Sequence, residues 1–304
     1  QTGDPNQVAA VSLCMPIFMV LMAFGNLFGV GGASYISRSL GVKDLDKCRH
    51  ISSFCFYGCI VVGVLLGVLF FFLMPQILPI AGASDNTYGF AKDYLTYIAF
   101  GAPFTCLQQA FGQIVRSEGA AKYAMTGMMI GTIVNIILDP IMILTLNMGV
   151  AGAAIATVIG NASSAIFYVI YILRSRERTV LSVAPSQFGF QKDILKNVFS
   201  IGEPMFLNNI LMSTANIFLN SAASSFSDAL VAALGVAHRI FSAITMLFIG
   251  LAQGMQPFVG YNYAAKNYGR MHGAIKFSAI FSVALGICLT IIGSIFAGDV
   301  VKAF

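Results

Sequence analysis

Residues 15–41 have the sequence MPIFMVLMAFGNLFGVGGASYISRSLG, in which Arg38 is the only charged residue. A helix that crosses a bilayer needs about 20 consecutive, mostly apolar residues, so this stretch is long enough to span a membrane. It also contains several glycines, which allow membrane helices to approach one another closely. The stretch therefore predicts a fold built from packed membrane-spanning helices.

The rest of the chain has the same character. Of its 304 residues, 58% are hydrophobic and 10% are charged, with a mean hydropathy of +0.83. A soluble domain carries about 25% charged residues. We therefore expect an all-α integral membrane protein of eight transmembrane helices. The segments long and apolar enough to span are 7–37, 51–80, 88–115, 122–146, 151–173, 195–221, 229–263 and 273–299.

The basic residues lie in alternate connections between these spans. Fourteen of the 17 Lys and Arg residues follow the first, third, fifth and seventh spans, whereas the other connections hold only Lys92. Positive residues accumulate on the cytoplasmic side of a membrane. We therefore predict that the odd-numbered spans run inward and that both chain ends lie outside. The fourteen are Arg38, Lys43, Lys47, Arg49, Arg116, Lys122, Arg174, Arg176, Arg178, Lys192, Lys196, Lys266, Arg270 and Lys276.

Composition also excludes several partners. The net charge of +5 comes from short basic clusters between apolar runs, a pattern typical of membrane orientation and not of a nucleic-acid-binding face. The six cysteines form no Cys-x-x-Cys pair, and no histidine lies at metal-ligand spacing from them. We expect no disulfide, metal centre, cofactor or nucleic-acid partner.

Part of the first span recurs 223 residues later in the chain. Residues 8–10, 17–18, Gly31 and Lys43 match residues 231–233, 240–241, Gly254 and Lys266 without a gap. The repeat carries the first span onto the seventh, so one unit holds six helices. Because six is even, the two units are parallel repeats, which is a transporter architecture. A twelve-span protein is therefore predicted, of which this chain is the second to the ninth span.

We expect three parts along the chain. Residues 1–175 form an N-terminal helix bundle and residues 195–304 begin a second bundle. Residues 176–194 are polar and basic and contain Pro185, which is typical of a cytoplasmic linker. The chain begins without Met and ends soon after an apolar run, so we expect a fragment that lacks the first span and the last three.

Several motifs resemble those of the multidrug and toxic compound extrusion (MATE) family, and the resemblance covers the whole chain. They are residues 15–41, RSEGAAKYAM (116–125), NIILDP (135–140), GVAGAAIATVIG (149–160) and GLAQGMQPFVGYNYAAKNYGR (250–270). The last is the most specific. The resemblance implies a two-bundle antiporter in the cytoplasmic membrane that exports organic, often cationic compounds in exchange for Na⁺ or H⁺. It implies no enzymatic activity, and we expect a monomer.

Asp139 is the strongest candidate for ion coupling. A carboxylate within a membrane span costs at least ~2.5–3.5 kcal/mol and indicates a functional site. Asn135 lies on the same helix face, and Pro140 withdraws a backbone N–H and so frees a carbonyl upstream. Thr157 of the next span lies at a similar depth. A turn at Asp139-Pro140 is the alternative explanation.

These side chains supply a carboxylate, an amide oxygen and a hydroxyl, a set of hard ligands suited to Na⁺. The carboxylate alone can carry H⁺, so the ion is left open. The resemblance implies the same trio, since archaeal and related bacterial members place their first-half cation site at this Asn, Asp and Thr. Those members add an Asp from the first span, which this chain lacks.

Other polar residues within spans are candidates for the substrate cleft: Glu203, Asn208, Arg239, Gln253 and Gln256. Glu203 could instead pair with Lys196 at the positive N-terminus of its helix. For Arg239 we favour a structural role facing the cavity. The acid that another branch of the family carries later in the sixth span is absent.

Two rival functions are considered. A lipid-linked glycan flippase of the same superfamily tends to have a strongly basic cavity, whereas these spans carry few cations besides Arg239. A membrane-embedded enzyme needs paired acids, an Asp-rich metal motif or a Ser/His dyad, and the three histidines are isolated. The sequence contains no G-x-x-x-x-G-K loop, so ATP is not the expected energy source.

Overall fold

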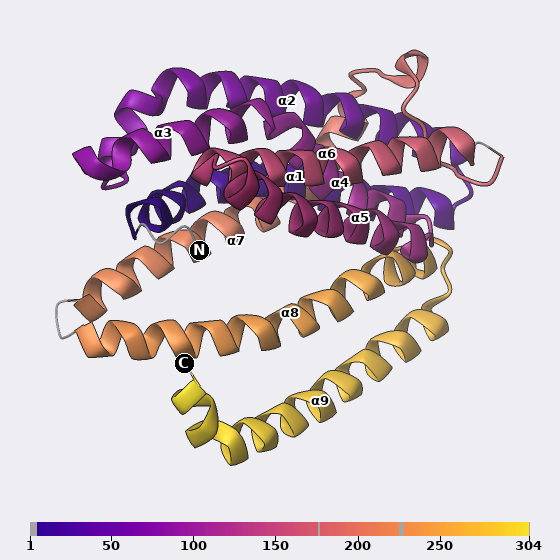
Figure 1. Cartoon of the computed structure of the whole chain (residues 1–304). Coiled ribbons are helices and arrows are strands. Elements are labelled where there is room, and N and C mark those ends of the chain that lie inside the picture. Colours follow the sequence, from indigo (N-terminus) through magenta and orange to yellow (C-terminus); the bar gives the residue numbers. More distant parts are fainter. Residues whose placement is uncertain (1–4, 176, 225–227, 304) are drawn as a thin grey trace.

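The computed structural model describes residues 5–175, 177–224 and 228–303, and all regular structure within these ranges is helical. The side chains of residues 5, 213, 216–218, 220–240, 292 and 296–303 lie outside the description. The α-helices are α1 (Pro5–Gly41), α2 (Leu45–Ile80), α3 (Asp85–Phe100), α4 (Ala102–Ser117), α5 (Ala121–Pro140), α6 (Gly149–Arg174), α7 (Lys192–Ser224), α8 (Asp228–Ala264) and α9 (Tyr268–Ala303) (Figure 1). A π-helix, Ile141–Thr145, continues α5, and a 3₁₀ turn covers Pro185–Gln187.

Every predicted span coincides with helical structure, but the predicted span 88–115 is not one helix. It is broken at Gly101 into α3 and α4. Pro103 is tolerated near the start of α4, where its missing N–H breaks no helical bond. Val158 of α6 packs so closely that a Cβ on Gly101 would lie 2.2 Å from its side chain. Tight packing at a glycine therefore accompanies the break.

Six helices in the described ranges are long and apolar enough to cross a membrane, and they belong to α1, α2, α5 with its π-helix, α6, α8 and α9. Much of their apolar surface remains exposed, as for Phe72 at 71% and Met246 at 74%. In a soluble protein such a surface would be exceptional. The exposure agrees with contact with lipid, and the protein is a multi-pass membrane protein.

α1 is the central helix of the fold. It packs against α2, α3, α4, α7 and α8, while α5 pairs with α6 (Figure 1). Two buried clusters fill the first six helices. One is centred on residues such as Ile36, Ile51 and Ile114, and the other on Leu21, Leu78 and Leu95. Five of the six cysteines are buried, and Cys288 is exposed.

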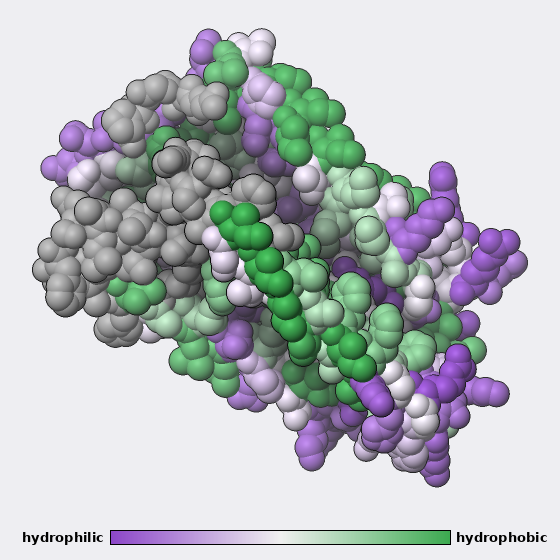
Figure 2. All heavy atoms as spheres, turned by 90° about the horizontal axis from the view of Figure 1, so that it is seen from below, coloured by the Kyte–Doolittle hydropathy of each residue, from purple (hydrophilic) through white to green (hydrophobic). Residues whose placement is uncertain are grey.

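The loops that follow α1, α4, α6 and α8 lie at one end of the molecule, on the right in Figure 1. We call this the basic end, because these loops hold the clustered Lys and Arg residues. Figure 2 shows hydrophilic side chains gathered at the same right-hand end, with apolar surface along the helices. The predicted cytoplasmic orientation would place the basic end inside the cell.

Helix bounds agree with the predicted repeat. α1 and α8 end at positions that differ by 223 residues, as do the first residues of α2 and α9. The connecting turns are also alike, because Lys43 and its counterpart Lys266 both have a positive φ, of 62° and 58°. A two-helix unit thus occurs twice with the same turn geometry.

The linker is attached to the first six helices. Ser182 exchanges hydrogen bonds with Ser52 of α2, with its N–H 2.8 Å from the hydroxyl oxygen and its carbonyl oxygen accepting at 3.0 Å. Ser53 and Tyr57 donate to the carbonyl oxygens of Ala184 and Val183 at 2.7 and 3.0 Å. Residues 182–184 are therefore part of the first bundle's surface and not a free tether.

Glu118, in the turn between α4 and α5, forms a second attachment. Its carboxylate accepts hydrogen bonds from the hydroxyls of Thr179 and Tyr171 at 2.6 and 2.8 Å, and from the Val180 N–H at 3.1 Å. Burial raises the pKa of Glu118, against the opposing effect of these donors. One half-buried carboxylate thus joins the α4–α5 turn, the end of α6 and the linker.

We predict that Glu118→Ala loosens the linker, because it leaves three donors without an acceptor at about 1–3 kcal/mol for each buried unsatisfied group. Trypsin cleavage after Arg178 of the purified protein should become about tenfold faster or more, since a tenfold change corresponds to about 1.4 kcal/mol. Glu177→Ala, which removes an exposed acid of the same segment, is the control. Equal cleavage rates in the two variants would contradict the attachment.

Candidate cation site

The site begins at an irregularity in α5. Pro140 has no N–H, and the N–H of Ile141 donates to the carbonyl oxygen of Leu138. The carbonyl of Ile136 therefore receives a hydrogen bond from neither residue. The helix does not end here but continues as the π-helix to Thr145, so the alternative of a turn at Asp139-Pro140 is wrong. Single-turn π segments are frequent at functional sites.

The structure brings Asn135, Asp139 and Thr157 together. The Asn135 Nδ2 atom lies 3.4 Å from Asp139 Oδ1 and 3.5 Å from Thr157 Oγ1. The Thr157 hydroxyl donates its proton to the Ala153 carbonyl at 2.9 Å, which leaves its oxygen lone pairs for other partners. All three side chains are half-buried. The Asn135 amide nitrogen from α5 thus lies between the Asp139 carboxylate and the Thr157 hydroxyl of α6, with both contacts at the long end of hydrogen-bond distance.

Glycines on both helices make this meeting possible. A Cβ on Gly131 or on Gly160 would lie 2.7 Å from the carbonyl oxygen of the other. A Cβ on Gly127 would likewise lie 2.2 Å from the Tyr168 ring. The Gly127-x-x-x-Gly131 motif thus packs α5 on α6, as predicted for small residues in membrane helices. Asn135 follows Gly131 by one turn and so faces α6.

A polar cavity of about 130 Å³ adjoins Asn135 and Thr157. Sequence analysis missed four polar residues of its lining: Gln108, Thr132, Asn161 and Ser164. Thr132 and Asn161 lie three or four residues from Asn135 and Thr157, a spacing that places side chains on one helix face. This spacing is the sequence feature from which Thr132 and Asn161 could have been predicted to join the site. Gln108 comes from α4, which the sequence alone does not place beside α5.

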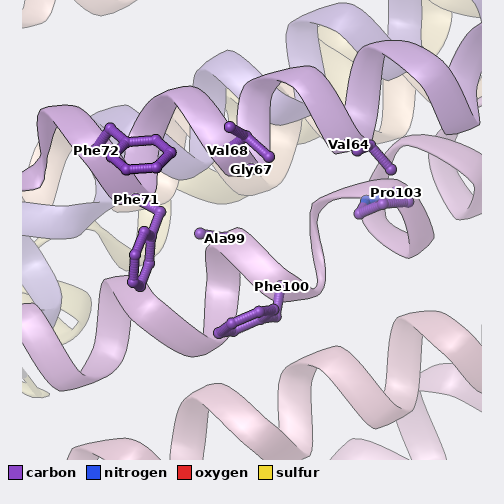
Figure 3. Close-up of a pocket in the computed structure, with 8 residues that line it drawn as sticks. All are labelled: Val64, Gly67, Val68, Phe71, Phe72, Ala99, Phe100 and Pro103. Carbon is purple, nitrogen blue, oxygen red and sulfur yellow. The ribbon is translucent and has the colours of Figure 1, made fainter.

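A second cavity has no such chemistry. It measures about 370 Å³ and lies between α2 and the break from α3 to α4, where Figure 3 shows Phe71 and Phe100 beside it. Its lining is entirely apolar: Val64, Gly67, Val68, Phe71, Phe72, Ala99, Phe100 and Pro103. It offers no ligand to a cation, so the polar cavity is the better candidate site.

The predicted cleft residues have different environments. The Arg116 guanidinium donates to Gln253 Oε1 at 2.7 Å, and Gln256 Nε2 lies 3.5 Å from the Val30 carbonyl oxygen. Both glutamines thus join α8 to the first bundle. Glu203 and Asn208 are exposed on α7.

The predictions for Glu203 and Arg239 have different outcomes. Among the described side chains, no ion pair joins Glu203 to Lys196, so that predicted alternative is not observed. Arg239 belongs to α8, but its side chain lies outside the described part.

The start of α7 is held at the basic end by charge. Lys47 Nζ lies 2.8 Å from Asp193 Oδ2, and the Tyr35 hydroxyl donates to the same oxygen at 2.5 Å. The hydrogen bond from Lys47, followed by that from Tyr35, lowers the pKa of Asp193. This contact joins α7 to α1 and α2, and the Arg116–Gln253 bond joins α8 to α4.

α1 touches α7 and α8 through glycines. A Cβ on Gly31 would lie 2.1 Å from the Val198 carbonyl oxygen, and one on Gly202 would lie 2.1 Å from the Leu27 carbonyl oxygen. A Cβ on Gly41 would lie 2.4 Å from the Tyr261 carbonyl oxygen. Because the obstructing atoms are backbone, no rotamer change can relieve the clash.

We predict that Gly31→Ala destabilises the protein by about 1–3 kcal/mol, as overpacking of an interface does. The measurement is the thermal unfolding midpoint in detergent, which should fall. Gly89→Ala in α3 is the matched control, since nothing lies within 4 Å of its Cβ position. A midpoint equally unchanged in both variants would mean that α1 and α7 do not pack as described.

Apolar spans, a repeated two-helix unit and a polar cluster between two spans are features of a membrane transporter. The sequence model of the MatE family matches residues 2–141 and 204–304. The chain belongs to this family, as its motifs predicted.

Curated relatives include the multidrug export protein MepA of Staphylococcus saprophyticus, 36% identical over 291 residues, and that of Staphylococcus aureus, 36% identical over 293. Each match covers 95% of this chain and 64% of the relative, so the chain spans less than two thirds of their length.

Solved structures of the family have the same fold. A MATE protein in the straight conformation matches with a TM-score of 0.93 at 28% identity, covering 99% of this chain and 67% of the other. A multidrug resistance MATE family transporter of the MOP superfamily in an outward-facing conformation matches with a TM-score of 0.92 at 28% identity. That match covers 99% of this chain and 66% of the other. The predicted MATE-like membrane fold is thus confirmed.

Proposed function

We propose that the protein exports small organic compounds from the cell in exchange for Na⁺ or H⁺. Membership of the MatE family and 36% identity to proteins named for multidrug export support the export of such compounds. We further propose two helix bundles, residues 1–175 and 195–304, joined by the linker 176–194. The basic end faces the cytoplasm, and the protein works as a monomer.

The convergence of Asn135, Asp139 and Thr157 is the observation that carries the coupling proposal. The Asn135 Nδ2 atom lies 3.4 Å from Asp139 Oδ1 and 3.5 Å from Thr157 Oγ1. A rotation of the Asn135 amide would turn its oxygen toward a cation, beside the Asp139 carboxylate and the Thr157 hydroxyl. Such ligands suit Na⁺, and the carboxylate can take up H⁺ instead.

Ion binding would act on the shape of α5. The π-helix and Pro140 lie directly after Asp139, so a charge change at the carboxylate occurs where the helix is already irregular. Neutralising the carboxylate would also remove the penalty for a charge within the span. The ion would thereby favour one of two arrangements of α5 and α6 and so bias the bundle between its states.

The observed state is proposed to be closed at the basic end. Arg116–Gln253, Lys47–Asp193 and the glycine contacts of α1 join the bundles there, and a relative of the same fold is outward-facing. Exposed Phe241 and Met246 on α8, at 62% and 74%, would offer adaptable apolar surface to a substrate.

The test is efflux of a cationic dye from cells that produce the protein at its full natural length. Asp139→Asn keeps the size of the side chain but cannot change charge. We predict that it lowers gradient-driven efflux by at least about tenfold, corresponding to about 1.4 kcal/mol. Asp85→Asn, which neutralises an exposed acid at the start of α3, should leave efflux unchanged.

Efflux is then measured in everted vesicles under a Na⁺ gradient alone and under a pH gradient alone. The gradient that drives the unchanged protein identifies the ion. Normal efflux by a well-inserted Asp139→Asn variant would show that Asp139 does not couple, and efflux that persists without either gradient would refute antiport.

A further inference from the structure

A cavity of about 400 Å³ lies at the basic end between the linker and the ends of α2 and α6. Its wall consists of the linker residues Thr179, 181–185 and Gln187, with Arg49 from α2 and Ile172 and Leu173 from α6. The linker is the loop at the upper right of Figure 1. The cavity is separate from the polar cavity at Asn135 and takes no part in the export mechanism proposed above.

The charged side chain in the lining of this cavity is positive. Arg49 is the only charged residue in its lining, and its contact with Asp46 on the same helix is long, at 3.5 Å. Arg174 and Arg178 are exposed and adjoin the lining residues Leu173 and Thr179 in sequence. Neither forms an ion pair with a described side chain. Glu177 is exposed between them in sequence, and the Glu118 carboxylate is already engaged by Thr179, Tyr171 and Val180, so Arg49 is the side chain that can receive an anion in the cavity.

Gln187 adds an unused hydrogen-bond acceptor. Its Oε1 atom is buried and has no partner among the described residues. A buried acceptor left unpaired is destabilising and calls for a donor. The carbonyl oxygens of residues 182–184 already accept bonds from α2. A ligand that carries a hydroxyl or amine beside its anionic group would satisfy Gln187.

The remaining wall is apolar and reaches the bilayer. Ile172 is buried, and Leu173 is 45% exposed on the last turn of α6, a helix apolar enough to span the membrane. The cavity thus lies where a span ends and a basic loop begins, at the level of lipid headgroups. Basic pockets in this position between membrane helices bind anionic lipid heads.

We propose that this cavity binds an anionic phospholipid of the cytoplasmic leaflet whose headgroup carries a hydroxyl. The phosphate lies against Arg49, the headgroup hydroxyl donates to Gln187 Oε1, and an acyl chain follows Leu173 along α6. The lipid would fill the space under the linker and strengthen its attachment to the first bundle.

The experiment titrates the detergent-purified protein, at its full natural length, with phosphatidylglycerol and records the thermal unfolding midpoint. Phosphatidylglycerol should raise the midpoint, and phosphatidylcholine, which is neutral overall and lacks a hydroxyl, should raise it less. Arg49→Gln should weaken the apparent affinity for phosphatidylglycerol about fivefold, the effect of one cation near a membrane surface. Gln187→Leu replaces the unpaired acceptor with an apolar side chain that cannot bind the headgroup hydroxyl, so it should also weaken the apparent affinity for phosphatidylglycerol.

Arg270→Gln is the matched control, since Arg270 is an exposed basic residue near the start of α9 and lies outside the cavity lining. It should leave the affinity unchanged. Equal stabilisation by the two lipids, or an unchanged response in Arg49→Gln, would overturn the site. Inorganic phosphate and glycerol 3-phosphate are titrated in parallel. Stabilisation by either that matches phosphatidylglycerol would mean that a soluble anion, and not a lipid, is the ligand.

Discussion

The close approach of α1 to α7 and α8 is the constraint on which the rest of the structure depends. Within a bilayer the hydrophobic effect does not drive helices together, so their association rests on tight packing and on small residues. Gly31, Gly41 and Gly202 allow backbone atoms to lie where a Cβ would clash. Because α1 also packs against α2, α3 and α4, it connects these helices to α7 and α8.

The same principle builds the candidate cation site. Gly131 and Gly160 bring α5 and α6 together, and the polar residues one turn further along then meet across the interface. A carboxylate at this depth would be costly in a lipid-facing position. Asn135 gives the carboxylate a polar neighbour, and Asn135 itself lines a polar cavity that would hold an ion. Packing and chemistry therefore depend on the same pair of helices.

Much of the fold could be predicted from the sequence, because the length and hydropathy of a segment show directly whether it can span a membrane. The repeat at an offset of 223 residues anticipated the matching ends of α1 and α8 and the similar turns at Lys43 and Lys266. The grouping of Asn135, Asp139 and Thr157 could be predicted for two reasons. Helical spacing puts Asn135 and Asp139 on one face, and the distance from the shared loop puts Thr157 at a similar depth in the next span.

What escaped prediction depends on contacts between segments distant in sequence. The break at Gly101 accompanies packing against Val158, and the partner of Gln253 is Arg116, 137 positions away. The linker looked like a free polar segment, yet Glu118 and the serines of α2 hold it in place. No local pattern reveals such partners.

The proposed export mechanism requires α8 to separate from α1 at the basic end. A Cβ on Gly260 would lie 3.1 Å from the Cβ of Ser37, within a few tenths of an ångström of disulfide geometry. The direct measurement is dye export by a Ser37→Cys, Gly260→Cys double variant in which the exposed Cys288 is replaced by Ser. Oxidation should abolish export and reduction should restore it, while each single variant stays active. Export at the unlinked rate by protein shown to be fully cross-linked would contradict the claim.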